Sequence, residues 1–212
     1  MLMHRLVSIL WWPAIWLVFR PRILGSEHLP KSQGFVVCPN HLSGFDAFAI
    51  AYALAPRPLR NMAKNQLFRR RLLGSVIARL GAFPAHDEPD LTGGVEAAKS
   101  FAARGDVVVI FPEGERRYGR FPRPRTGAAR TALGADVPLV PAAIRGTNGW
   151  RRRARWQIAF GEPIELDDLR DLDPAQAAPE ATQRLWEQVR DLEAVLGAPT
   201  AGRDLRQREC LS

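Results

Sequence analysis

The chain has 212 residues, 46% of them hydrophobic, which is enough to bury one core and is most simply accommodated in a single domain. Its formal net charge of +8 favours anionic partners such as nucleic acid, anionic lipid or a phosphorylated ligand. The two cysteines, Cys38 and Cys210, lie far apart and form no metal-ligand pattern. This argues against a disulfide framework or a structural zinc site and favours a reducing compartment.

The first segment of the chain is strongly apolar. Every residue from Leu6 to Phe19 except Ser8 is apolar, three tryptophans lie within this run, and arginines flank it. Such a helix spans only about 21 Å, short of the roughly 30 Å hydrocarbon core, and Pro13 would interrupt it. No small-residue cleavage site follows, which argues against a signal peptide. We expect residues 1–21 to form a membrane-associating helix at the cytoplasmic face of the cell membrane; a helix docked on the core is the alternative.

Short apolar runs then alternate with helix-like stretches. In chain order, we predict a strand at 34–38, a helix at 46–54, a weaker strand at 59–63, a helix at 68–80, a strand at 82–85, a helix at 92–104, a strand at 107–111, a helix at 125–133, strands at 137–144 and 156–160, and a helix at 185–196. This alternation predicts a single α/β domain in which helices flank a central, mostly parallel or mixed sheet. No repeat or composition shift marks a second domain, so we place the domain at 22–197 and a flexible tail at 198–212.

A histidine and an aspartate follow the first predicted strand, at the edge where parallel sheets collect functional residues. Glu113 follows the strand predicted at 107–111, and residues 141–147 close the strand predicted at 137–144, so these three segments could share one end of the sheet. His41 and Asp46 are five positions apart, and a regular helix would rotate them by about 140°, so that they would not face each other. They can meet only where the chain turns, and Ser43-Gly44 is typical of a turn. A carboxylate that orients a histidine makes it a better base. The simpler interpretation is a loop histidine and an aspartate that caps the next helix.

Four blocks of residues occur in an order that resembles one enzyme family. Asn40-His41 with Asp46 forms the first block, and residues 64–68 form the next. Residues 111–116 read Phe-Pro-Glu-Gly-Glu-Arg, and residues 125–129 with 137–141 complete the set. Together the blocks cover about residues 22–165 and resemble the membrane acyltransferases typified by 1-acyl-glycerol-3-phosphate acyltransferase.

This resemblance implies a glycerolipid acyltransferase-like fold and an O-acyltransferase of phospholipid biosynthesis. His41 would act as general base on an acceptor hydroxyl, and Asp46 would fix its tautomer. The hydroxyl would attack the thioester of acyl-CoA or acyl-carrier protein, and backbone N–H groups around Gly114 are candidate donors to the resulting oxyanion. No cofactor and no metal are expected, because no cluster of side chains has ligand spacing.

The resemblance also implies residues that bind the acceptor, a lysophospholipid or related lipid at the membrane surface. Glu113, Gly114 and Arg116 would do so, and the guanidinium of Arg116 suits a phosphate. Lys64 is either a second anion contact or an ordinary surface lysine. One position departs from the family pattern. A further family block commonly reads GxxxxxR, and the matching segment here, residues 81–87, ends in Asp87 instead of arginine. A carboxylate there would repel a phosphate, so either another arginine substitutes for it or the acceptor carries no phosphate.

Two other classes of protein, and an inactive lipid-binding relative, remain as alternatives. A nucleic-acid-binding protein would explain the charge and the arginine runs at 69–71 and 151–155, but no recognisable module is present and few aromatic residues accompany the arginines. A hydrolase would use Ser43 or Cys38 with His41. It would lack the G-x-S-x-G elbow, and Cys38 lies in a strand predicted to be buried.

Overall fold

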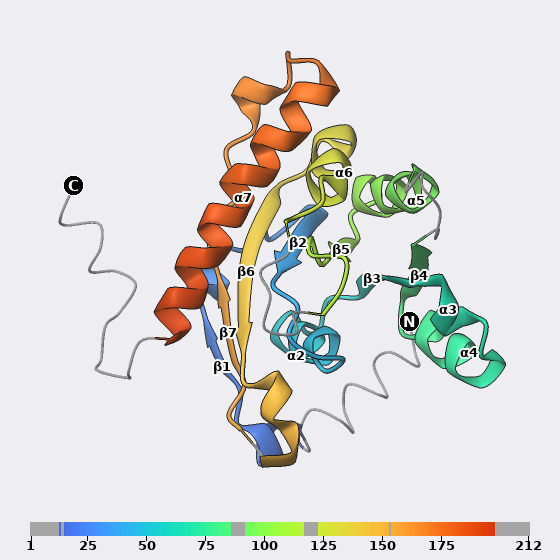
Figure 1. Ribbon diagram of the computed structural model, residues 1–212, viewed down its shortest axis with the longest axis vertical. Coiled ribbons are helices and arrows are strands. Elements are labelled where there is room, and N and C mark those ends of the chain that lie inside the picture. The colour runs from blue at the N-terminus through green and yellow to red at the C-terminus, as the bar shows by residue number, and fades with distance from the viewer. Residues whose placement is uncertain (1–12, 14, 86–91, 117–122, 153, 198–212) are drawn as a thin grey trace.

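The computed structural model describes residues 13, 15–85, 92–116, 123–152 and 154–197, and these form an α/β fold around a seven-stranded sheet (Figure 1). The strands are β1 (Arg22–Leu24), β2 (Phe35–Pro39), β3 (Leu59–Lys64), β4 (Ala82–Ala85), β5 (Val107–Val109), β6 (Leu139–Arg145) and β7 (Gln157–Phe160). The helices are α2 (Asp46–Ala53), α3 (Asn65–Phe68), α4 (Arg71–Arg79), α5 (Thr92–Ala103), α6 (Gly127–Ala135) and α7 (Pro174–Gly197), with 3-10 helices η1 (Ser26–His28), η2 (Thr147–Arg152) and η3 (Asp167–Leu169). The predicted fold class is confirmed.

The strand order explains how distant segments meet. Neighbouring strands follow the order β1-β7-β6-β2-β5-β3-β4, in which β6, β2, β5, β3 and β4 are parallel and β7 is antiparallel to β6. Strand β2 therefore lies between β6 and β5, with Val37 opposite both Val140 and Val109. Because parallel strands end at the same edge, the residues that follow β2, β5 and β6 converge there.

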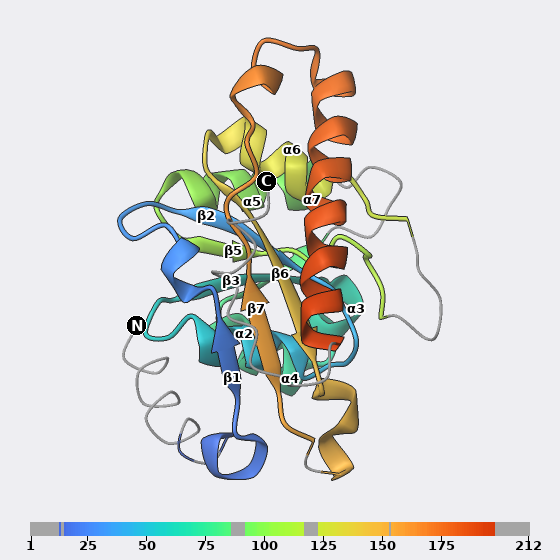
Figure 2. The same ribbon diagram turned by 90° about the vertical axis from the view of Figure 1, so that its left-hand side faces the viewer.

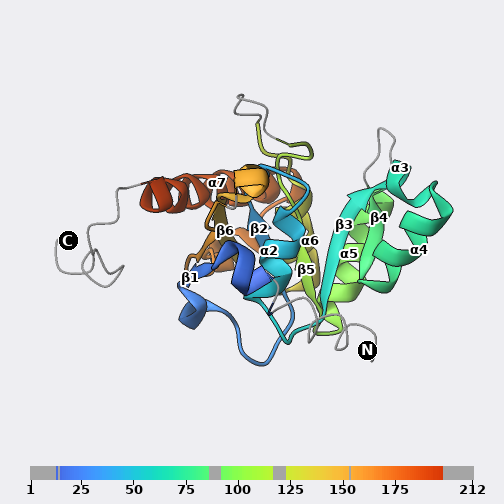
Figure 3. The same ribbon diagram turned by 90° about the horizontal axis from the view of Figure 1, so that it is seen from below.

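Helices cover both faces of the sheet. The buried residues of α5, α6 and α7 form one apolar cluster with one side of the strands, and those of α2 and of a helical turn at 15–19 form a second cluster with the other side. The connections from β2 to β3 and from β3 to β4 cross the sheet in one direction, so right-handed crossovers place α2, α3 and α4 on the same face. Helix α7 runs along β6 and β7 (Figure 2), whereas α3 and α4 lie beside β4 at the end of the sheet opposite β1 (Figure 3).

The helix predicted at 68–80 corresponds to α4, which begins at Arg71, and Phe68 at its predicted start is the last residue of α3. Arg70 between them is extended, and the chain bends there. Gly74 of α4 packs so closely on α3 that a Cβ atom would lie 2.7 Å from the carbonyl oxygen of Phe68. The glycine, which periodicity alone treats as one more helical position, is what allows the two helices to approach each other.

Helix α7 begins eleven residues before the predicted helix at 185–196. Proline usually breaks helices, and the added part of α7 contains Pro174 and Pro179. Pro174, however, is the first residue of α7, where no N–H is needed, and Asp173 Oδ1 accepts a 2.7 Å hydrogen bond from the Ala175 N–H. Buried alanines on both sides of Pro179 pack this part of the helix against the sheet.

The amino-terminal segment is only partly described, because residues 1–12 and 14 lie outside the described part of the chain. Within it, Ile15 is buried and Phe19 stacks on Trp156, with 4.2 Å between ring centroids. Trp16 and Leu17 are 58% and 70% exposed. The segment therefore combines a docked side with an exposed apolar side. In the described residues, no helix has the length and apolarity needed to cross a bilayer. The predicted tail at 198–212 also lies outside the described residues.

Candidate active site

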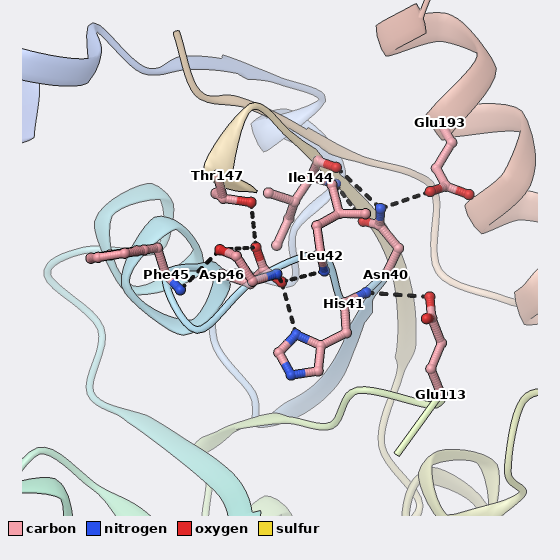
Figure 4. A network of polar contacts seen from close by, with 10 residues as sticks. Asn40, His41, Leu42, Phe45, Asp46, Glu113, Ile144, Thr147 and Glu193 are labelled. Atoms are coloured by element: carbon pink, nitrogen blue, oxygen red, sulfur yellow. Dashed lines mark hydrogen bonds and ion pairs between the residues drawn. The ribbon is translucent and has the colours of Figure 1, made fainter. Parts of the chain in front are cut away.

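The turn after β2 brings His41 and Asp46 together (Figure 4). His41 Nδ1 lies 2.8 Å from Asp46 Oδ2, so the prediction that the two side chains meet across a turn is confirmed. Ser43 Oγ accepts a 3.1 Å hydrogen bond from the Phe45 N–H and closes the turn. Gly44 has no positive φ, and a Cβ atom there would meet open space. The turn therefore depends on Ser43 rather than on the conformational freedom of Gly44.

The carboxylate of Asp46 is fully buried and accepts hydrogen bonds at both oxygens. Oδ2 accepts from the N–H groups of Leu42 (2.6 Å) and Ser43 (2.8 Å). Oδ1 accepts from the hydroxyl groups of Thr147 (2.5 Å) and Ser43 (3.4 Å). These donors lie in the loop before α2 and in η2, so the carboxylate does not serve as an ordinary cap of the α2 N–H groups. The simpler interpretation of Asp46 is wrong.

This network fixes the tautomer of His41. Because Asp46 Oδ2 is an acceptor, His41 Nδ1 must donate, and in the neutral imidazole this leaves the lone pair on Nε2. The imidazole stacks on Phe111, with 4.2 Å between ring centroids, and 20% of the side chain is exposed. Nε2 points away from Asp46 (Figure 4), and within the described part of the chain it has no hydrogen-bond partner. A basic nitrogen is therefore held rigidly and faces outward.

Asn40 attaches the start of this loop to the rest of the fold. It is fully buried, its Oδ1 accepts from the Ile144 N–H (2.6 Å), and its Nδ2 donates to the Ile144 carbonyl (3.1 Å). The side chain thereby continues the pairing of β2 with β6 beyond the last backbone pair. Nδ2 also donates to Glu193 Oε1 of α7 (2.7 Å). The residue directly before His41 is thus fixed by β6 and by α7.

The loop after β5 contacts the other side of His41. Glu113 is buried, and its Oε1 accepts a 3.3 Å hydrogen bond from the His41 N–H. Gly114 has a φ of 69°, which favours glycine, and its N–H donates to the Phe111 carbonyl (3.0 Å). The N–H of Gly114 is occupied within the turn, so the prediction that N–H groups around Gly114 bind the oxyanion now rests on its neighbours.

Three basic residues lie at the edge of the sheet that carries His41, two of them at the Glu113–Gly114 turn and one farther away. Arg116 is exposed and follows the Glu113–Gly114 turn, and Arg125 lies over the same turn, where its Nε would be 2.8 Å from a Cβ atom on Gly114. Lys64 is exposed at the end of β3, two strands away from β2. The structure therefore brings Glu113 to His41, whereas Lys64 lies farther along the edge. Asp87 lies outside the described residues.

The rival nucleophiles are poorly placed. Cys38 is fully buried in β2, and burial raises the pKa of its thiol, which disfavours the reactive thiolate. The Ser43 hydroxyl is engaged by Asp46 and by the Phe45 N–H rather than by His41. In the described residues, no group of three or more His, Cys, Asp or Glu side chains could hold a metal ion.

Comparison with known proteins identifies the family. Residues 20–145, more than half of the chain, match the acyltransferase family. The chain belongs to this family. Its relatives include the 1-acyl-sn-glycerol-3-phosphate acyltransferase of Bacillus subtilis, which is 27% identical over 81% of this chain and 87% of the relative. The enzyme of the same name from Streptococcus pneumoniae is 26% identical over 68% of this chain and 54% of the relative.

A solved structure agrees with the fold of this acyltransferase. The crystal structure of the 1-acyl-sn-glycerophosphate (LPA) acyltransferase PlsC from Thermotoga maritima matches with a TM-score of 0.64. The two chains are 22% identical, and the match covers 84% of this chain and 74% of that chain. The sheet flanked by helices is therefore shared with PlsC.

Sequence reasoning missed three contacts that support the loop carrying His41 and Asp46. They are made by Thr147, by Glu193 and by the side chain of Asn40, which the sequence marked only as part of the motif. The segment 141–147 was expected at the same edge of the sheet as His41, but nothing in the sequence identified Thr147 as a hydrogen-bond partner of Asp46. The signal available was its position directly after a predicted strand that lies parallel to β2.

We expect Thr147→Val to lower the free energy of unfolding by about 1–3 kcal/mol, because a buried carboxylate oxygen loses its shortest hydrogen bond. Acyl transfer should fall by roughly tenfold as Asp46 and His41 lose their fixed orientation. Thr147→Ser should retain most of both quantities. Denaturant unfolding and acyl-transfer kinetics would measure them.

Thr131 provides the matched control for this change. It is equally buried, and its hydroxyl donates to the Gly127 carbonyl within α6. Thr131→Val should leave acyl transfer at the wild-type rate. Equal losses of activity in the two valine variants would show that Thr147 acts only through general stability.

Proposed function

We propose that this acyltransferase moves a fatty acyl chain from acyl-CoA or acyl-carrier protein to a hydroxyl group of a lysophospholipid or related lipid, with His41 as general base. The observation that carries the proposal is the outward-facing Nε2 of His41, whose tautomer is set by the buried carboxylate of Asp46. The names of the Bacillus and Streptococcus relatives support a glycerol-phosphate acceptor class.

The reaction follows from this geometry. His41 Nε2 removes the proton of the acceptor hydroxyl while the oxygen attacks the carbonyl carbon of the thioester. The new C–O bond produces a tetrahedral oxyanion, and its collapse breaks the C–S bond and restores the carbonyl group. The imidazolium then returns its proton to the departing thiolate. Asp46, 2.8 Å from Nδ1, stabilises the imidazolium while it carries that proton.

The acceptor is proposed to bind beside the Glu113–Gly114 turn. Arg116 would contact an acceptor phosphate, and Arg125 is a second candidate because its side chain lies over Gly114. Either arginine could replace the one whose position Asp87 takes. Lys64, at the same edge of the sheet, would provide a more distant anion contact. An acceptor without a phosphate is the second candidate, and Asp87 is the observation that favours it.

We further propose that the enzyme works at the cytoplasmic face of the cell membrane. Residues 1–21 would form a membrane-associating helix, 22–197 the catalytic domain and 198–212 a tail. The exposed Trp16 and Leu17 support the first assignment, because apolar side chains on an outward helix face favour the membrane interface.

A screen of acceptors with the purified full-length protein tests this function. We expect thiol release from long-chain acyl-CoA or acyl-carrier protein to depend on an added acceptor, and lysophosphatidic acid to be the best in a panel that includes amino-lipids and glycolipids. Mass spectrometry of the product would identify the ester. A preference for an acceptor without a phosphate would support the second candidate, and absence of transfer to every acceptor, despite lipid binding, would indicate an inactive relative.

A further inference from the structure

The exposed apolar side chains of the fold are concentrated on one face. Of eight large apolar residues exposed in the described part of the chain, seven belong to the turn at 15–19 and to α2, α3 and α4. They are Trp16, Leu17, Val18, Phe48, Leu67, Leu72 and Val76. The eighth, Leu172, lies between η3 and α7 on the other side of the sheet. Scattered exposed leucines need no explanation, but a one-sided distribution indicates an interaction surface.

The packing of helix α4 on α3 directs two of its apolar side chains toward solvent. Its inner side is defined by Gly74, which is buried against the backbone of Phe68. Residues two positions away on a helix are rotated by about 200°, so Leu72 and Val76 must point away from α3. They are 88% and 53% exposed. An ordinary surface helix presents mainly polar residues to solvent, whereas α4 exposes Leu72 and Val76 together with its arginines.

Positive charge accompanies this apolar surface. Arg69, Arg70, Arg71 and Arg79 are all exposed, and residues 65–80 contain no aspartate or glutamate. Apolar side chains surrounded by arginines match the chemistry of an anionic bilayer. The leucine and valine side chains can enter the acyl boundary while guanidinium groups contact lipid phosphates.

We propose that the α3–α4 surface, formed by Leu67, Leu72, Val76 and Arg69–Arg71, docks on an anionic lipid bilayer. Helix α3 begins directly after β3 at the carboxyl edge of the sheet, the edge at which His41 lies. Docking there turns the candidate active site toward the lipid headgroups. The surface is a second bilayer contact beside the amino-terminal segment. It extends the proposed membrane localisation and does not depend on acyl transfer.

Co-sedimentation of the full-length protein with vesicles tests the proposal. The vesicles are phosphatidylcholine alone or phosphatidylcholine mixed with phosphatidylglycerol. Leu72→Ser combined with Val76→Ser should reduce the partition coefficient on the anionic vesicles by about tenfold, because two exposed apolar side chains no longer insert. Leu172→Ser, on the opposite face, should leave it unchanged.

The charge contribution is tested by a second pair of variants. Arg69→Gln with Arg70→Gln should lower binding to the anionic vesicles by about tenfold or more and should leave binding to phosphatidylcholine nearly unchanged. This loss should shrink at high salt. Arg130→Gln with Arg190→Gln removes the same charge from exposed positions on α6 and α7 and should have a much smaller effect.

Several results would overturn the proposal. Wild-type partition of both α3–α4 variants, together with loss of binding by Trp16→Ser and Leu17→Ser, would assign the whole contact to the amino-terminal segment. Unchanged vesicle binding with a shift from dimer to monomer would show that a second copy of the chain covers the surface. Acyl transfer to a soluble short-chain acceptor should stay at the wild-type rate in these variants, so failure of docking and failure of catalysis are separable.

Discussion

Replacing His41 with alanine is expected to lower kcat for acyl transfer by roughly 10²–10⁴-fold, the usual contribution of a positioned general base. The imidazole carries the one nitrogen of the Asp46 network that faces outward with a lone pair. Alanine leaves the acceptor hydroxyl without a base and preserves the binding residues around Glu113, so KM should change little. Acceptor-dependent thiol release under saturating substrates measures the effect.

His28 offers the control for this substitution. Its Nδ1 lies 3.2 Å from the Phe160 carbonyl oxygen and its Nε2 lies 3.2 Å from Glu162. These contacts are near β1 and β7, at one end of the strand order, and not at the loop that carries His41. His28→Ala should therefore keep wild-type kinetics. If His41→Ala also kept the wild-type kcat while remaining folded by circular dichroism, His41 would not be the base and the proposed mechanism would be wrong.

The parts of the fold that could be predicted are those that depend on local pattern. Alternation of buried strands with helices predicted the sheet, and the tendency of functional residues to follow parallel strands predicted that His41, Glu113 and segment 141–147 share one edge. The five-residue spacing of His41 and Asp46 also required a turn between them, and the structure contains this turn. These features depend on the periodicity of apolar residues and on the direction of the strands, and both can be inferred from residues that are close together in the sequence.

The parts that could not be predicted depend on contacts between distant residues. The Thr147 hydroxyl reaches Asp46 across 101 positions, and Glu193 reaches Asn40 across 153. Neither partner has a local signature, because a buried threonine or a helical glutamate looks the same in sequence whether or not it supports a catalytic loop. The exposed apolar side of α4 escaped prediction for a related reason, since the orientation of that helix depends on how Gly74 packs against Phe68.

These distant contacts explain how one short loop becomes rigid. Asn40 and Asp46 flank this loop. Asn40 is hydrogen-bonded to Ile144 of β6, and Asp46 is hydrogen-bonded to Thr147 at the start of η2. A general base gains most when its orientation is fixed before the substrate arrives. The sheet supplies the position of His41, and the buried polar network supplies its direction.

Asp46→Asn is the substitution that separates charge from orientation, and we expect it to lower kcat by roughly 10²–10³-fold. The backbone N–H groups of Leu42 and Ser43 point at Oδ2, so the amide must keep its oxygen there and place its nitrogen toward the Thr147 hydroxyl, which can rotate to accept. His41 Nδ1 would still donate to an oxygen, and the tautomer would be retained. Only the negative charge that stabilises the imidazolium would be lost.

Asp46→Ala makes the comparison informative. It leaves the two loop N–H groups and the Thr147 hydroxyl unpaired in a buried site, so the free energy of unfolding should fall by about 3–5 kcal/mol, whereas asparagine should cost much less. Denaturant unfolding would measure this difference, and kcat of the folded asparagine variant would measure the charge alone. An asparagine variant with wild-type kcat would reduce Asp46 to a structural support of the turn, and His41 would then act without assistance from a carboxylate.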